Sequence, residues 1–242
     1  MRGLLVAVGF LTRIPVPVRV FADARAQSAS LAWYPAVGLL LGALLSALAW
    51  LLADAPPLLA AALVLLAWIG LTGALHLDGL ADSADAWVGG LGDRERTLSI
   101  MKDPRCGPAG VVALVAVLLL KFAALASLPR DAWLLLLVPP LLGRTALTAA
   151  FVCTPYVRAA GLGSMLVSAS RVRGLGAITV AVLGVAFAFG VAGVIAGATA
   201  ITLFALWRRG CMRRIGGFTG DTAGALAEVT EAAVLVALVF TA

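Results

Sequence analysis

Residues 57–75 read PLLAAALVLLAWIGLTGAL, a run with no charged side chain. An α-helix needs about 20 consecutive apolar residues to cross the hydrocarbon core of a bilayer. The rest of the chain has the same character, since 62% of its 242 residues are hydrophobic and only 12% are charged. This composition excludes an ordinary soluble domain and predicts an all-α fold, a polytopic integral membrane helical bundle.

Further apolar segments divide the chain into candidate membrane-spanning helices. They lie at about 31–53, 108–128, 132–153, 175–207 and 222–240. The segment 175–207 holds about 33 residues, which is too many for one ordinary span and few for two. Arginine and lysine help to decide between these alternatives, because they gather on the cytoplasmic side of membrane proteins.

The basic residues favour a hairpin in segment 175–207. Their clusters lie in residues 1–30, 94–105, 158–173 and 208–214. All of these clusters fall on one side of the membrane only if the segment turns back near residues 190–197. We therefore expect about seven transmembrane helices, a cytoplasmic N-terminus and a C-terminus on the outer side.

The N-terminal segment 1–11 is apolar but short. Arg13, Pro15 and Pro17 follow it and interrupt the apolar run that a signal peptide would need. We expect a retained N-terminal interfacial helix here. No linker of domain-boundary character follows, so residues 1–242 are expected to form a single integral-membrane domain.

Charge and cysteine content exclude several other functions. The net charge of +6 rests mainly on arginine, which orients helices and contacts membrane lipid headgroups. The basic residues are not interleaved with aromatic ones, so we expect no nucleic-acid partner. Three cysteines without a CxxC pair indicate neither a disulfide framework nor a zinc site.

The polar stretch HLDGLADSAD (residues 76–85) follows directly on the apolar run 57–75 and carries Asp78, Asp82 and Asp85. At 100° per residue, their spacing places the three carboxylates within an arc of about 60° on one helix face. Like charges repel unless a cation neutralises them, and oxygen ligands suit Mg²⁺ or Mn²⁺. A solvated helix end is the alternative. Only 12 residues are acidic in the whole chain, and their clustering favours a metal site.

A second acidic set lies in residues 213–231, which read RRIGGFTGDTAGALAEVTE. Asp221 and Glu228 are seven residues apart and share a helix face, whereas Glu231 lies about 80° further round. Carboxylates inside a membrane helix are costly, which makes both residues candidate metal ligands and Asp221 also a catalytic candidate. The alternatives are that Asp221 caps the last helix and that Glu228 pairs with an arginine.

Basic and glycine residues near these acids suggest phosphate binding. Gly217 and Gly220 would offer bare N–H groups at the start of the last helix. Lys102 and Arg105 flank Asp103, although positive flanking residues of a span would also explain the two cations. Arg144 lies inside segment 132–153 and needs either a carboxylate of the bundle or a substrate phosphate.

His76 is the only histidine of the chain. It is either structural, or it donates a hydrogen bond to a metal-binding carboxylate, binds the metal itself or acts as a general base. Helical geometry turns its ring about 160° away from Asp78, which argues against direct ligation. The whole pattern predicts phosphoryl or nucleotidyl-diphosphate chemistry on an amphiphilic substrate, with Mg²⁺ clamping a pyrophosphate. Asp82, Asp85, Asp221 or His76 would take the proton from an attacking hydroxyl.

Six stretches, in order along nearly the whole chain, resemble the cobalamin synthase family, adenosylcobinamide-GDP ribazoletransferase. They are FLTRIP (10–15), WYPAVG (33–38), HLDGLADSAD (76–85), MKDPRCG (101–107), Gly143-Arg144 and GGFTGDTAGALAE (216–228). The position after Asp85 is Ala86, where the family pattern has glycine. Pro104 and Pro108 also depart from the pattern, and none of these differences removes a candidate ligand.

The resemblance implies a Mg²⁺-dependent enzyme of the bacterial inner membrane, with its active site facing the cytoplasm. It implies that the hydroxyl of α-ribazole, or of its 5′-phosphate, attacks adenosylcobinamide-GDP and expels GMP. Carried over by position, the metal acids are Asp78, Asp82, Asp85, Asp221 and Glu228, and the phosphate-binding cations are Lys102, Arg105 and Arg144. A homo-oligomer, or a complex with other enzymes of cobalamin assembly, is compatible with the resemblance.

Two other classes share some of these features. A CDP-alcohol phosphotransferase also clusters aspartates on a membrane helix, but its motif needs an acid at Leu75 and an arginine after Ala81. A cation transporter would place its acids nearer the membrane midplane and would need no phosphate-binding loop.

Overall fold

The computed structural model describes residues 1–158 and 163–241, and its regular elements are helices. The α-helices are α1 (Arg2–Leu11), α2 (Ala24–Ser30), α3 (Tyr34–Leu51), α4 (Pro57–Thr72), α5 (Leu75–Gly89), α6 (Arg94–Ile100), α7 (Pro108–Ser127), α8 (Val138–Cys153), α9 (Arg171–Ile215) and α10 (Gly220–Val239). Short 3₁₀ helices are η1 (Val18–Ala22), η2 (Leu31–Trp33), η3 (Trp133–Leu137) and η4 (Ser164–Leu166). Residues 159–162 of the predicted polar connection lie outside the described part.

Five helical segments of the described residues are long and apolar enough to cross a membrane. They are Ala24–Leu51, Pro108–Ser127, Trp133–Cys153, Arg171–Ile215 and Gly220–Val239. Helices α4 and α5 pass the same test only as a pair, and they meet at a bend of 88°. Because α4 is apolar throughout whereas α5 carries three aspartates, we treat α4 as the membrane part and α5 as lying outside the spans. The predicted all-α membrane bundle is confirmed.

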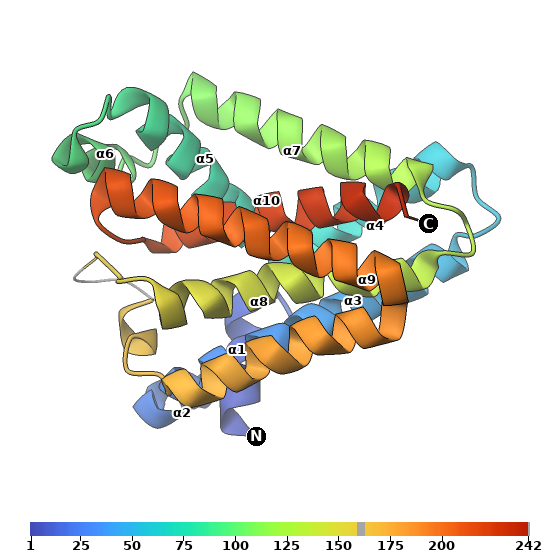
Figure 1. Ribbon diagram of the computed structural model, residues 1–242, viewed down its shortest axis with the longest axis horizontal. Coiled ribbons are helices and arrows are strands. Elements are labelled where there is room, and N and C mark those ends of the chain that lie inside the picture. The colour runs from blue at the N-terminus through green and yellow to red at the C-terminus, as the bar shows by residue number, and fades with distance from the viewer. Residues whose placement is uncertain (159–162, 242) are drawn as a thin grey trace.

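Helix α9 is a hairpin, as the charge distribution predicted. Its chain reverses at Gly190, where φ is 54° and ψ is −128°, a conformation that glycine adopts without steric cost. Arg171 and Arg208, at opposite ends of α9, donate to the neighbouring carbonyls of Val152 and Cys153. Figure 1 shows the first arm of α9 running alongside α3 and the second arm running back along α10. With α9 counted as two crossings and the α4–α5 pair as one, the described helices are compatible with the prediction of about seven.

Helix α10 lies at the centre of the bundle and packs against α5, α7, α8 and α9. Its buried residues include Leu226, Ala227, Val234, Leu235 and Leu238, so apolar side chains surround it on several faces. Any side chain on this helix that is not apolar must therefore find a partner inside the protein.

The N-terminal segment is helical, as predicted. Helix α1 packs on α2 and α3, and its Ala7 and Leu11 share a buried core with Tyr34 of α3 and Ala223 of α10. This packing places α1 beside the start of α10. Its location in the membrane interface stays a prediction.

Candidate active site

Helices α5 and α10 approach each other closely at two glycines. A Cβ atom at Gly79 would lie 2.7 Å from the backbone oxygen of Asp221, and one at Gly224 would lie 3.2 Å from that of His76. Only glycine leaves room for this approach. The contact joins the two acidic motifs that the sequence singled out, although they are far apart along the chain.

A cavity of about 320 Å³ opens beside this contact. One part of its wall is polar and comes from His76, Asp78, Arg158, Gly220 and Asp221. The other part is aromatic and comes from Phe10, Tyr34, Phe151 and Tyr156. The cavity therefore collects predicted site residues from both motifs, together with aromatic side chains that suit a planar ring.

Asp82 lies one turn beyond Asp78 on α5 and is partly buried. Its burial, followed by the negative charges of Asp78 and Asp221, raises the pKa of Asp82 to about 6. The predicted repulsion between these carboxylates is therefore present in the folded protein. Within the described residues, no three His, Cys, Asp or Glu side chains are arranged to hold a metal ion.

The carboxylates of Asp78, Asp82 and Asp221 fit a cation site that is completed by the substrate. Mg²⁺ is usually bound through one or two carboxylates, with water and substrate phosphates completing its coordination, rather than by an all-protein cage. Asp78 and Asp221 offer oxygen ligands of that kind in the wall of the cavity, and Asp82 is close enough for both charges to act on its carboxyl. The arrangement fits an ion shared with a phosphate ester and does not form a preformed cage.

Asp85 has a structural role that the sequence pattern did not indicate. Its carboxylate oxygens accept hydrogen bonds from the backbone N–H groups of Gly107, at 2.6 Å, and Gly110, at 2.9 Å. These groups lie at the start of α7, where the helix dipole favours a negative charge. Asp85 therefore joins α5 to α7, and its roles in metal binding and catalysis stay predictions.

Asp221 is not the cap of α10. Thr219 is the capping residue, since its hydroxyl accepts a hydrogen bond from the backbone N–H of Thr222. The Thr222 hydroxyl in turn accepts a hydrogen bond from the backbone N–H of Thr219. The Asp221 carboxylate instead lies 3.2 Å from the guanidinium of Arg158. Arg158 also donates to the carbonyl of Met101, at 3.3 Å. The capping alternative for Asp221 is thus wrong, and its carboxylate belongs to the cavity.

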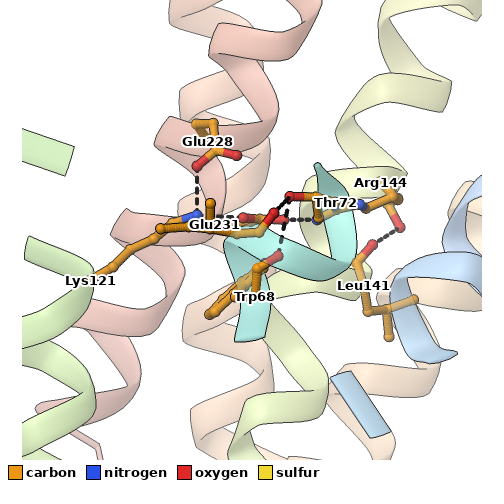
Figure 2. A network of polar contacts seen from close by, with 9 residues as sticks. Trp68, Thr72, Lys121, Leu141, Arg144, Glu228 and Glu231 are labelled. Atoms are coloured by element: carbon orange, nitrogen blue, oxygen red, sulfur yellow. Dashed lines mark hydrogen bonds and ion pairs between the residues drawn. The ribbon is translucent and has the colours of Figure 1, made fainter. Parts of the chain in front are cut away.

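Glu228 lies deeper in the bundle, in a network of buried ion pairs (Figure 2). Lys121 of α7 lies 2.6 Å from both Glu228 and Glu231, and Glu231 also pairs with Arg144 of α8. All four side chains are at most 5% exposed. The Lys121 ammonium also lies 4.5 Å from the centre of the Trp68 ring.

The network bears on two predictions. Glu228 has an ion-pair partner, as one alternative held, but the partner is Lys121 and not an arginine. Arg144 is fully buried and has a carboxylate partner within the bundle, which is the first of its two alternatives, and phosphate binding by Arg144 stays a prediction. The two cations and two carboxylates balance, which offsets part of the cost of burying them.

The loop before α7 leaves both of its cations exposed. Arg105 donates to both oxygens of Asp103, at 2.9 and 2.7 Å, and these hydrogen bonds lower the pKa of Asp103 to about 2. Lys102 is exposed as well. Arg105 thus binds Asp103 bidentately, while phosphate binding by either cation stays a prediction.

The glycines before α10 have different roles. Gly217 is buried and packs on the carbonyl of Pro155, beside the bridge between Tyr156 and Phe218. This close backbone contact requires glycine and gives Gly217 a structural role, and its phosphate contact stays a prediction. Gly220 is exposed, has open space around its Cα and lines the cavity.

Two functional candidates could not be recognised from the sequence. Arg158 was one of several arginines in a polar connection, and Lys121 was one basic residue in an apolar helix. Each gains its role through a partner more than 60 residues away along the chain. An intramembrane lysine was the one available signal, because such residues need a partner.

Comparisons with known proteins identify the family of the chain. The model of the family cobalamin-5-phosphate synthase matches residues 3–239. A curated adenosylcobinamide-GDP ribazoletransferase of Stutzerimonas stutzeri (strain A1501) is 55% identical over 98% of both chains. One of Pseudomonas aeruginosa (strain UCBPP-PA14) is 53% identical, again over 98% of both chains. No solved structure matches. On these findings and the shared motifs, the chain belongs to the cobalamin-5-phosphate synthase family.

Proposed function

We propose that this protein transfers the adenosylcobinamide phosphate moiety of adenosylcobinamide-GDP to α-ribazole, or to its 5′-phosphate, and releases GMP. The observation that carries the proposal is the cavity between α5 and α10. Its wall includes Asp78, Asp221 and Arg158 as well as four aromatic side chains. The names of the relatives supply the substrates, and the cavity supplies groups that suit a phosphate ester attached to a planar base.

The proposal assigns Mg²⁺ to Asp78, Asp82 and Asp221. The bound ion would neutralise charge on the pyrophosphate of the nucleotide substrate. Asp85 and Glu228 already bind backbone N–H groups and Lys121, respectively, so they are weaker ligand candidates. Without a cation, the like charges around Asp82 would oppose the approach of a further anion.

Residues of the chain itself would bind and orient the substrates. Arg158 carries a positive charge at the cavity wall and can hold a phosphate oxygen. Tyr34 and Phe151 would pack against a flat base. His76 lines the cavity and its Nδ1 atom has no hydrogen-bond partner among the described residues. Burial and the positive charges of Arg144 and Lys121 lower the pKa of its imidazole, so His76 would be a weaker base for the attacking hydroxyl than the carboxylates.

The size of the cavity limits what it can enclose. Its volume of about 320 Å³ lies at the low end of the 300–1,000 Å³ that is usual for small-ligand sites. A nucleoside fits such a space, whereas a whole corrinoid does not. The corrinoid part of the substrate would therefore stay outside the cavity while its phosphate reaches in.

The proposed location is the bacterial inner membrane, with the cavity open to the cytoplasm. The basic clusters at the two ends of α9 and before α7 support this orientation, because positive residues stay on the cytoplasmic side. A homo-oligomer, or a complex with other enzymes of cobalamin assembly, would fit the membrane location.

The test is GMP release by protein reconstituted in liposomes with adenosylcobinamide-GDP, α-ribazole and Mg²⁺. We expect GMP only when α-ribazole is present, and loss of GMP with EDTA and in Asp82→Asn. GMP formed without α-ribazole would mean hydrolysis and would contradict the transfer reaction. Full activity in EDTA would contradict the metal assignment alone.

A further inference from the structure

We propose that the face between α2, α3 and the first arm of α9 binds an anionic phospholipid. Two adjoining cavities carry the proposal, a polar one and an apolar one. They share Ala32 in their walls. Neither has a wall residue in common with the cavity between α5 and α10, so this is a separate site.

The polar cavity has a volume of about 330 Å³ and carries two guanidinium groups. Arg25 comes from α2, Arg173 from the first turn of α9, and serines 28, 168 and 170 lie between them. Among the described residues, neither arginine takes part in an ion pair, and the nearby Asp23 pairs with Arg2. Two arginines without a carboxylate attract an anion, and guanidinium binds phosphate bidentately.

The start of α9 adds to this attraction. Ser170 caps the helix by accepting the backbone N–H of Arg173, and no acidic residue lies in the first turn. The positive end of a long helix dipole therefore faces the same space as the two arginines. A negatively charged group in this cavity would meet only positive and neutral partners.

The apolar cavity continues from the polar one along the gap between α3 and α9. Its volume is about 570 Å³, and its wall includes Leu39, Leu141, Val180 and Gly184. Gly184 has open space around its Cα, so this part of the α9 surface is not covered by protein. Trp33, at the junction, is 41% exposed, as aromatic residues at a membrane interface often are.

The polar and the apolar cavity together favour a phospholipid over other anions. A soluble phosphate would use Arg25 and Arg173 but leave the apolar groove unfilled. A neutral lipid would fill the groove but leave the arginines without an anion. An anionic phospholipid satisfies both parts at once, with its phosphate at the arginines and an acyl chain along Gly184, and basic pockets between membrane helices are suited to such headgroups.

The test is native mass spectrometry of the purified protein in a neutral detergent, titrated with phosphatidylglycerol, phosphatidylcholine or glycerol 3-phosphate. We expect saturable binding of phosphatidylglycerol that is at least tenfold tighter than binding of either other ligand. Arg25→Gln and Arg173→Gln should each weaken it by about fivefold, the effect of one basic residue at a charged surface. Arg209→Gln, an equally exposed arginine on the second arm of α9, is the matched control and should leave binding unchanged.

A second pair of variants tests the apolar cavity between α3 and the first arm of α9. Gly184→Leu should fill it and weaken phosphatidylglycerol binding, whereas Gly70→Leu, at an equally open glycine of α4, should not. The proposal is overturned if the Arg25 and Arg173 variants bind phosphatidylglycerol like Arg209→Gln. It is also overturned if glycerol 3-phosphate binds as tightly as the lipid, or if Gly184→Leu binds like the wild type.

Discussion

The guanidinium of Arg158 lies 3.2 Å from the carboxylate of Asp221. This pair links the connection between α8 and α9 to the start of α10, at the wall of the cavity that carries the candidate site. Arg158 is partly exposed at the cavity wall, so its guanidinium can also contact a substrate phosphate, while a cation bound by Asp221 would neutralise that carboxylate.

We therefore expect Arg158→Gln to lower kcat/KM for adenosylcobinamide-GDP by about 10- to 100-fold, the effect of losing one charged hydrogen bond. The unfolding temperature should change little. Arg158→Lys should recover part of the activity, because the charge remains while the bidentate geometry is lost. Wild-type kcat/KM in Arg158→Gln would show that the substrate phosphate does not use this side chain.

Lys121 holds two buried carboxylates, Glu228 and Glu231. Its removal in Lys121→Met would leave negative charge uncompensated inside the bundle and should destabilise the protein by about 3–5 kcal/mol. Combining it with Glu228→Gln should recover much of this loss. Thermal unfolding in detergent measures both effects, and an unchanged unfolding temperature for Lys121→Met would contradict the buried network.

Asp85 offers a way to separate a structural role from a metal-binding one. Asp85→Ala removes the acceptor of the Gly107 and Gly110 N–H groups and should cost about 1–2 kcal/mol of stability. Asp85→Asn keeps one acceptor oxygen and should cost less. If Asp85→Asn folds like the wild type but has no activity at any Mg²⁺ concentration, Asp85 acts in catalysis as well as in capping.

Gly79 sets the distance between the two acidic motifs. In Gly79→Ala the new methyl group would press on the backbone of Asp221, which should cost about 1–3 kcal/mol and displace Asp221 from Asp78. We expect GMP release to fall more than tenfold while much of the protein remains folded. Gly70→Ala, at a glycine with open space around it, is the control. Equal activities in the two variants would mean that the approach of α5 to α10 does not position the site.

Features that depend on composition and local pattern could be predicted from the sequence. The bias of arginine and lysine placed the reversal of α9 within residues 190–197, and the chain turns at Gly190. The motifs also predicted a joint role for Asp78 and Asp221. Both line one cavity, and their part in the reaction stays a prediction. The hairpin of α9 could be predicted because membrane insertion responds to the charge and hydrophobicity of neighbouring residues.

Features that depend on tertiary partners could not be predicted. Nothing near Glu228 in the sequence shows that Lys121 lies beside it, and nothing near Gly217 shows that Pro155 packs on it. The capping of α10 by Thr219 was missed for another reason. Thr219 and Asp221 both lie close to the start of α10, so a shift of two residues in its expected boundary changes which one is the cap.

The most direct test of the account compares GMP release by Asp78→Asn and Asp221→Asn with release by Asp131→Asn, an exposed acid outside the cavity. All three variants lose one negative charge, and reconstituted protein of equal amount and fold is assayed with both substrates and Mg²⁺. The account predicts a loss of at least about 100-fold in the two cavity variants, comparable to removing one electrostatic group from an active site, and wild-type release in Asp131→Asn. Wild-type release by Asp221→Asn would contradict the claim that this cavity is the active site.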